Sequence, residues 1–178
     1  MTSLSFDTKE LPLLTTLVYR VELVDWNFRE AVHKGLSELK TFIDKNKLDA
    51  QISKQTAGLG VGPIKYIGTE SMYYETGYVF IGDAESLIQS GEVGFITDKG
   101  GNKREGLFIR KIPSGKWRVA VLYGSYEGLY QAWRSMMDHI KETGLEIDPK
   151  RPCYEHYLKD YKLVKEEELE TELLVPIL

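Results

Sequence analysis

The chain has 178 residues and a mass of 20.4 kDa, which suits a single domain spanning residues 1–178. Its formal charge of −4 argues against nucleic acid as a partner, because phosphate binding needs a concentrated basic face. The first residues predict no secretory signal, and no apolar run is long enough to cross a membrane. The single cysteine, Cys153, excludes a disulfide framework and is typical of a cytoplasmic protein.

The first part of the chain predicts a strand, a helix and a connection. Residues 1–14 are expected to be a leader, and residues 15–24 alternate and are rich in β-formers, so they predict the first strand. Asp25 can cap the helix that follows, whose apolar side chains recur at helical spacing. Residues 51–71 contain alternating glycines but lack the Lys-Ser/Thr ending of a P-loop. We therefore expect a connecting loop there, not a phosphate site.

The middle of the chain is less regular. Residues 72–82 predict a strand dense in aromatic side chains, and residues 83–91 predict a helical turn. The polar, glycine-rich residues 97–106 predict an exposed, mobile loop. A further strand is expected over residues 107–112. The turn at residues 113–115 then predicts a hairpin that leads into the next strand.

The last third predicts the order strand, helix, strand, strand. Residues 116–124 are β-branched and aromatic, and Ser125 can cap the helix after them. Gly144 suits the left-handed residue that would end this helix. Two short strands are expected at residues 153–158 and 169–178.

The two halves repeat the same order of elements. Glu75-Thr76 precedes an apolar strand in the first half, as Glu170-Thr171 does in the second. We therefore predict an α+β fold of two βαββ units with an antiparallel sheet. Repeat one covers about residues 15–112, with an inserted loop at 83–105, and repeat two covers about residues 113–178.

Glu155 is an unusual residue for the middle of a short strand. Strand interiors are depleted in glutamate, and burying a carboxylate is unfavourable unless it is paired. Alternation places Cys153, Glu155 and Tyr157 on one face of the strand, with Tyr154 and His156 on the other. Composition alone favours a Glu155 that faces solvent. The alternative is a Glu155 that lies in a cleft, to meet a cation or to move a proton.

Five segments of the chain, taken in order, resemble the GyrI-like small-molecule-binding family. They are Leu122–Gly128, Ala132-Trp133, Gly144-Leu145, Tyr154–Tyr157 and Glu170–Ile177. This family includes the gyrase-inhibitory protein and the effector-binding domains of multidrug-sensing transcription regulators. The resemblance implies two SH2-like βαββ repeats around a pseudo-two-fold axis, with a central ligand cleft between them. It also implies that Glu155 meets cationic aromatic ligands in that cleft.

The predicted partner is therefore a hydrophobic, often cationic small molecule, bound for sequestration or sensing, with no cofactor and no metal. Aromatic rings supply stacking and cation–π attraction, and one carboxylate balances the ligand charge. Only about fourteen residues precede the first predicted strand, too few for a helix-turn-helix, so we expect a stand-alone relative of the regulators. The predicted ligand-binding residues are Glu155, Tyr157, Tyr123, Trp133, Tyr19, Tyr73, Tyr78 and Trp117.

Two other functions stay open at this stage. Some stand-alone GyrI-like proteins hydrolyse cyclopropane-bearing electrophilic toxins. By that analogy Glu155 would act as a general base, with Tyr157 or Tyr123 as a proton donor, provided that burial raises the pKa of Glu155. The third function is inhibitory binding to DNA gyrase. An acidic exposed loop would favour it, but the loop at residues 97–105 is mixed or basic in charge.

Overall fold

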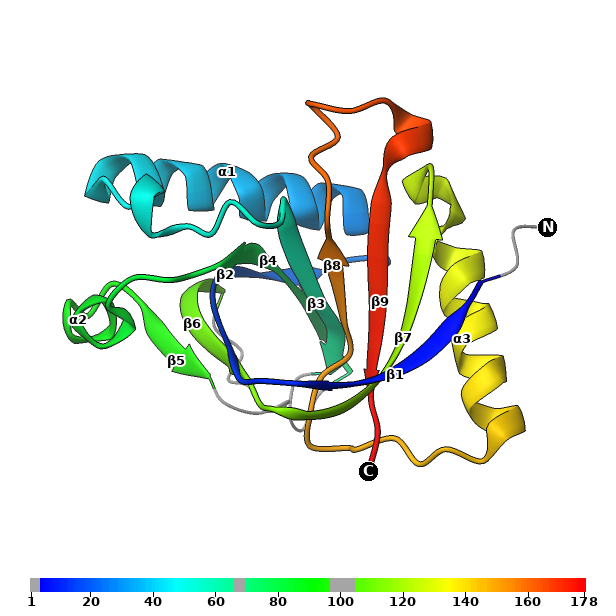
Figure 1. The fold of residues 1–178 in the computed structure, drawn as a ribbon. Helices are drawn as coiled ribbons and strands as arrows, with labels where there is room; N and C mark the ends of the chain where they lie inside the picture. The colour runs from blue at the N-terminus through cyan, green and yellow to red at the C-terminus, as the bar shows by residue number, and fades with distance from the viewer. Residues whose placement is uncertain (1–3, 66–69, 97–104) are drawn as a thin grey trace.

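The computed structural model describes residues 4–65, 70–96 and 105–178 (Figure 1). Over these residues the chain forms one sheet with helices packed against it. The helices are α1 (Phe28–Asn46), α2 (Ala84–Gln89) and α3 (Leu129–Thr143), with 3-10 turns η1 (Asp49–Gln51), η2 (Tyr126–Gly128) and η3 (Glu166–Glu168). The strands are β1 (Phe6–Leu11), β2 (Leu14–Leu23), β3 (Gly58–Lys65), β4 (Met72–Val79), β5 (Gly94–Ile96), β6 (Gly106–Ile112), β7 (Gly115–Tyr123), β8 (Tyr154–Tyr157) and β9 (Glu170–Pro176).

The nine strands that the structure describes form a single curled sheet in the order β1-β7-β9-β8-β3-β4-β2-β6-β5. The sheet curls into a half-barrel, and α1 and α3 lie on its outside (Figure 1). Neighbouring strands are antiparallel except β5 and β6, which are parallel. The α+β class is confirmed, with this parallel pair as an exception to the predicted antiparallel sheet.

The β3–β8 pair lies at the middle of the sheet, with a strand-helix-strand-strand set on each side. One set is β2-α1-β3-β4 and the other is β7-α3-β8-β9. In both sets the first strand lies farthest from this central pair, the second strand belongs to the pair and the third strand lies between them. That the two sets superimpose as repeats about a pseudo-two-fold axis stays a prediction.

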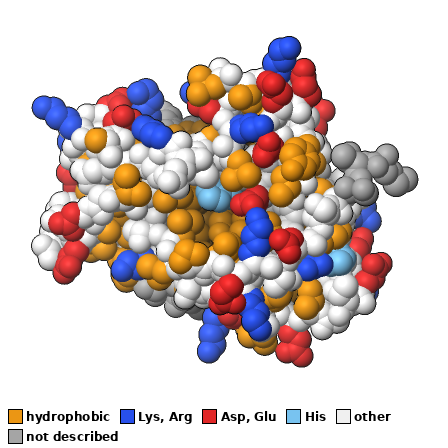
Figure 2. All heavy atoms as spheres, in the orientation of Figure 1, with side chains coloured by type: hydrophobic (Ala, Val, Ile, Leu, Met, Phe, Trp, Pro, Cys, Tyr) orange, Lys and Arg blue, Asp and Glu red, His pale blue; other side chains and the backbone are white. Residues whose placement is uncertain are grey.

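Three main apolar clusters hold these layers together. The first fills the inside of the half-barrel and includes Trp117, Tyr73 and Tyr154. The second packs α1 against the sheet through residues such as Leu39, and the third packs α3 through residues such as Met136. Each fully buried large apolar side chain contributes about 1.5–3 kcal/mol. Figure 2 shows hydrophobic side chains gathered near the middle of one face, with charged side chains around them.

Two predictions about strand pairing were wrong. The sequence predicts residues 6–11 as part of a leader, but they form strand β1 at the sheet edge, where Phe6 pairs with Ala120 of β7. Half of the residues of this edge strand are exposed and none is fully buried, so its sequence carries few of the apolar residues that mark a strand. The turn at residues 113–115 joins no hairpin, because β6 pairs with β2 and β5 while β7 pairs with β1 and β9. Alternation identifies a strand but not its neighbours.

The glycine-rich residues 58–65 were also predicted wrongly, because they form β3 and not a loop. Glycine weakens a strand and therefore masked this one. The glycines leave room for neighbours, since a Cβ on Gly60 would lie 1.8 Å from the hydroxyl oxygen of Tyr74.

The N-cap of α1 is Asn27 and not the predicted Asp25, whose backbone is left-handed with a φ of 49°. Residues 97–104, predicted as a mobile loop, lie outside the described residues.

A carboxylate that sequence reasoning used only as a repeat marker lies in the core. Glu75 of β4 is fully buried and accepts hydrogen bonds from two fully buried arginines, Arg20 of β2 and Arg110 of β6. The Nη2 atoms of both arginines lie 2.9 Å from Glu75 Oε1. The Arg20 guanidinium also lies 3.9 Å from the centre of the Tyr73 ring. Glu75 thus has cationic partners within the protein.

Candidate functional site

Glu155 lies at the middle of the sheet, on the short strand β8. It pairs with Gly60 of β3 on one side and with Leu173 of β9 on the other. The predicted alternation is confirmed, since Cys153, Glu155 and Tyr157 face a cleft while Tyr154 points into the half-barrel. The glycine opposite Glu155 leaves space above the strand, and side chains from other elements fill part of it.

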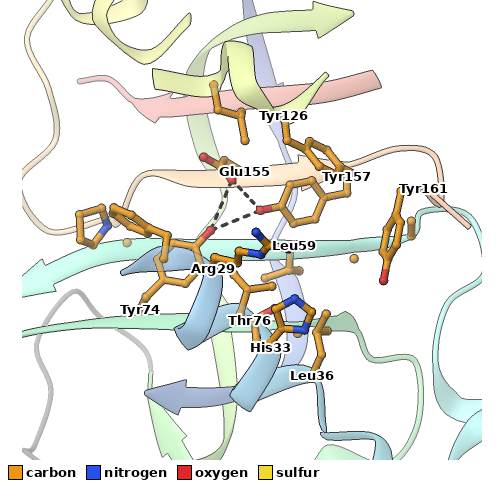
Figure 3. A pocket seen from close by; sticks show the side chains of 18 of the residues that line it. Arg29, His33, Leu36, Leu59, Tyr74, Thr76, Tyr126, Glu155, Tyr157 and Tyr161 are labelled. Carbon is orange, nitrogen blue, oxygen red and sulfur yellow. Dashed lines mark hydrogen bonds between the residues drawn. The ribbon is translucent and has the colours of Figure 1, made fainter. Parts of the chain in front are cut away.

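Three neutral donors from three elements surround the Glu155 carboxylate. Trp133 Nε1 of α3 donates to Oε1 at 2.6 Å, and the Tyr157 hydroxyl donates to Oε2 at 2.6 Å. The Tyr74 hydroxyl of β4 donates to the same Oε2 at 3.3 Å and lies 3.4 Å from the Tyr157 hydroxyl. Figure 3 shows the two tyrosines converging on Glu155. The carboxylate is thus oriented by hydrogen bonds, with no cationic partner among the residues that the structure describes.

Burial raises the pKa of Glu155 above that of an ordinary glutamate, although its three donors act in the opposite direction. Burial also raises the pKa of the Tyr74 and Tyr157 hydroxyls, which therefore stay protonated and act as donors. Within the described chain, no lysine or arginine forms an ion pair with Glu155. This arrangement differs from that of Glu75, whose two oxygens both meet arginines.

The cleft above Glu155 has a volume of about 1530 Å³ and lies between α1 and α3. This volume exceeds that of many drug-sized sites. Its floor comes from β3, β4 and β8, and the chain around Asp160 borders it. Aromatic side chains are frequent on every side. They are Trp26, Phe28, Tyr74, Tyr78, Tyr126, Tyr130, Trp133, Tyr157 and Tyr161.

Half of the predicted ligand-binding residues line this cleft, namely Glu155, Tyr157, Trp133 and Tyr78. The other four lie elsewhere. Tyr73 and Trp117 are buried inside the half-barrel, because their positions on alternating strands face inward. Tyr19 packs between two apolar clusters beside α1, and Tyr123 is exposed at the end of β7.

Sequence reasoning missed several side chains of the cleft, among them Tyr74, Tyr126, Arg29 and His33. Tyr74 adjoins Tyr73, and a strand buried on both faces does not show which of two neighbouring tyrosines faces the site. Gly60 was the available signal, since a glycine beside a buried carboxylate indicates a close approach by another group. Arg29 and His33 lie one turn apart on α1, a pattern that also fits a solvated face.

A sequence profile described as the GyrI-like small molecule binding domain matches residues 24–178, which is most of the chain. The chain belongs to the GyrI-like family. The resemblance drawn from the five sequence segments is thereby confirmed, and the protein carries a small-molecule-binding domain. No curated protein matches the sequence.

Solved structures share the fold of this GyrI-like chain at low sequence identity. The EcmrR C-terminal domain is 15% identical with a TM-score of 0.65, and the match covers 98% of each chain. In a complex of EcmrR with DNA, the match covers 98% of this chain and 57% of the EcmrR chain. SAV2435 bound to tetraphenylphosphonium is 13% identical with a TM-score of 0.65, over 98% and 94% of the chains. A hydrolase from Listeria innocua is 13% identical with a TM-score of 0.56, over 97% and 91%.

The described residues of the GyrI-like chain show neither a metal-binding cluster nor a membrane-spanning helix. No group of three or more His, Cys, Asp or Glu side chains there is arranged to hold a metal ion. None of the described helices has the length and apolar character needed to cross a membrane.

Proposed function

We propose that the cleft binds flat aromatic compounds that carry a positive charge, with Glu155 as the charge partner. The observation that carries this proposal is the enclosed Glu155 carboxylate, whose partners Trp133, Tyr74 and Tyr157 are all neutral donors. Burying an ionised carboxylate without a cation is unfavourable. A cationic ligand would supply the missing charge, as Arg20 and Arg110 do for Glu75.

The aromatic lining supports the same ligand class. Phe28 lies edge-on to Tyr74 with ring centres 5.4 Å apart, and Tyr126 lies edge-on to Tyr157 at 5.6 Å. Such rings offer faces for stacking and for cation–π attraction, neither of which demands one hydrogen-bonding pattern. A wide cleft of this kind would accept many ligands. We therefore extend the proposal to multidrug-type binding, with sequestration or detoxification of such compounds in the cytoplasm as its role.

Replacing Glu155 with glutamine tests the proposed charge partner. The substitution removes the charge but keeps the shape and an acceptor for the Trp133 donor. We expect the wild type to bind a cationic rhodamine ester with micromolar affinity, and Glu155→Gln to weaken binding at least about fivefold. Isothermal titration calorimetry on the two proteins measures this difference.

Glu142→Gln is the matched control, because it makes the same change of charge on an exposed residue of α3 outside the cleft. This control should bind the dye as the wild type does. Equal affinities for the wild type and Glu155→Gln would contradict the proposed role of Glu155. A loss of affinity in both variants would instead point to the net charge of the protein.

The pH dependence of binding gives a second prediction. A permanent cation such as tetraphenylphosphonium needs the ionised form of Glu155, whose pKa is raised by burial. The affinity should therefore fall as the pH is lowered through this pKa, and the fall should begin at a higher pH than for an ordinary glutamate. Titrations at a series of pH values measure it. In Glu155→Gln the affinity should stay level over the same range, and a level profile in the wild type would count against the prediction.

A second candidate function is hydrolysis of cyclopropane-bearing electrophiles. It is favoured by the raised pKa of Glu155 and by the Tyr157 hydroxyl 2.6 Å from its carboxylate. Glu155 would accept a proton from the attacking water, and Tyr157 would donate one to the oxygen that takes up negative charge. Tyr123, the other predicted donor, lies outside the cleft. Turnover by the wild type but not by Glu155→Gln would support this function. Inhibitory binding to DNA gyrase stays a prediction.

A further inference from the structure

The walls of the cleft differ in charge. The part of α1 that lines the cleft presents Arg29, His33 and Lys40 and no carboxylate. The facing part of η2 and α3 presents Glu127 and no basic side chain, and Glu155 lies on the floor. The border at residues 159–162 presents both signs, through Lys159, Asp160 and Lys162. The cleft therefore has a basic wall on α1 at one side of an acidic floor.

The guanidinium of Arg29 is free to meet a ligand. Lys40 is held by Asp44, with its Nζ 2.7 Å from the carboxylate. Arg29 has no hydrogen-bond, ion-pair or cation–π partner within the described residues, and Figure 3 shows it beside His33 in the same view as Glu155. Four other described arginines contact carboxylate, hydroxyl, imidazole or carbonyl groups. They are Arg20, Arg110, Arg118 and Arg151.

We propose that the cleft is built for an amphoteric aromatic ligand, with a cationic group toward Glu155 and an anionic group such as a carboxylate toward Arg29. This inference rests on the proposed function. The planar guanidinium of arginine fits a carboxylate through two parallel hydrogen bonds. His33, one helical turn further along α1, adds an imidazole at the same wall.

The discrimination between the two kinds of ligand comes from Arg29, because Glu155 attracts the cationic group of both. A ligand that is only cationic gains attraction from Glu155 but meets repulsion from Arg29 across the cleft. A ligand with both charges is attracted by Glu155 at one end and by Arg29 at the other. The specificity of the cleft is the difference between its affinities for the amphoteric and the purely cationic ligand. Arg29 is thus a specificity-determining residue of the cleft, and Glu155 supplies affinity for both kinds of ligand.

Rhodamine B and its methyl ester form a matched pair of probes. Rhodamine B carries a free carboxylate beside its cationic ring system, and the ester keeps only the cation. We expect the wild type to bind rhodamine B more tightly than the ester. Arg29→Gln should weaken rhodamine B binding about fivefold and leave ester binding unchanged or stronger. Isothermal titration calorimetry measures all four affinities.

Arg134→Gln is the control for Arg29→Gln. Arg134 is exposed on α3, lies outside the cleft and has no partner among the described residues, so its loss changes the net charge equally. It should not alter the preference for rhodamine B. An equal effect of both arginine variants, or an unchanged preference in Arg29→Gln, would overturn the inference.

Glu155→Gln separates this inference from the proposed function. In one outcome, the wild type binds the ester, Glu155→Gln weakens ester binding, and Arg29→Gln keeps the preference for rhodamine B over the ester. The proposed function then stands, and the proposal of an amphoteric ligand is overturned. If the wild type binds neither dye, both proposals fail. Both proposals are supported if Glu155→Gln weakens the binding of both dyes and if only Arg29→Gln loses the preference for rhodamine B.

Discussion

Glu75→Gln is expected to lower the free energy of unfolding by about 3–5 kcal/mol, the usual result when one partner of a buried ion pair is removed. The change keeps the shape of the side chain but removes the charge that Arg20 and Arg110 contact. Both guanidinium groups are fully buried and would stay in the core without that carboxylate. Urea denaturation followed by circular dichroism measures the loss.

Glu155→Gln is the matched control for this prediction, because it is the same substitution at a second enclosed carboxylate of the same sheet. Burial raises the folded-state pKa of Glu155, so its contribution to stability is present at low pH and declines as the pH rises through that pKa. At neutral pH, Glu155→Gln should therefore leave the free energy of unfolding unchanged or increase it. Comparable losses of unfolding free energy in Glu75→Gln and Glu155→Gln would contradict the prediction that the arginine partners of Glu75 make its carboxylate the more important one for stability.

Gly60→Ala is expected to lower ligand affinity at least about tenfold and the free energy of unfolding by about 1–3 kcal/mol, as overpacking does. A Cβ at this position would lie 1.8 Å from the Tyr74 hydroxyl oxygen, 2.7 Å from Tyr74 Cζ and 3.1 Å from the Tyr157 hydroxyl oxygen. The tyrosines would have to move, and Glu155 would lose one or both of these donors. Calorimetric titration and urea denaturation measure the two effects.

Gly60→Ala could act by displacing Tyr74 or by disturbing strand β3, and Tyr74→Phe separates these two effects. It removes the hydroxyl that the new Cβ would meet, without adding atoms. If the alanine acts through Tyr74, the double variant should lose less than the sum of the two single variants, in a double-mutant cycle. Additive losses would mean that the alanine disturbs β3 itself.

Alternation predicted the orientation of Glu155 and Tyr157 correctly, because a strand reverses the direction of its side chains at every residue. The same rule did not separate Tyr73 from Tyr74, since β4 is buried on both faces and each face carries one buried polar residue, Glu75 beside Tyr73 and Thr76 beside Tyr74. The rule also missed β3, where glycines that make room for Tyr74 hide the strand pattern.

Two further errors concerned long-range pairing. The pairing of β1 with β7, and the separation of β6 from β7, depend on contacts between segments far apart in the chain. No local pattern encodes such contacts. The same limit applies to Arg29, because its place in the cleft depends on how α1 packs on the sheet and not on its neighbours in sequence.

The curl of the sheet has a mechanical consequence for the ligand. The helices that border the cleft lie outside the half-barrel, and the two halves meet between β3 and β8 along only four residue pairs. A bulky ligand that spreads α1 from α3 must bend the sheet more sharply at this short ladder. Sharper bending compresses the Trp117 and Tyr154 rings inside, and such interiors resist compression. We therefore expect the stiffness of these inner side chains, which lie outside the cleft, to limit the size of ligand that the proposed site accepts.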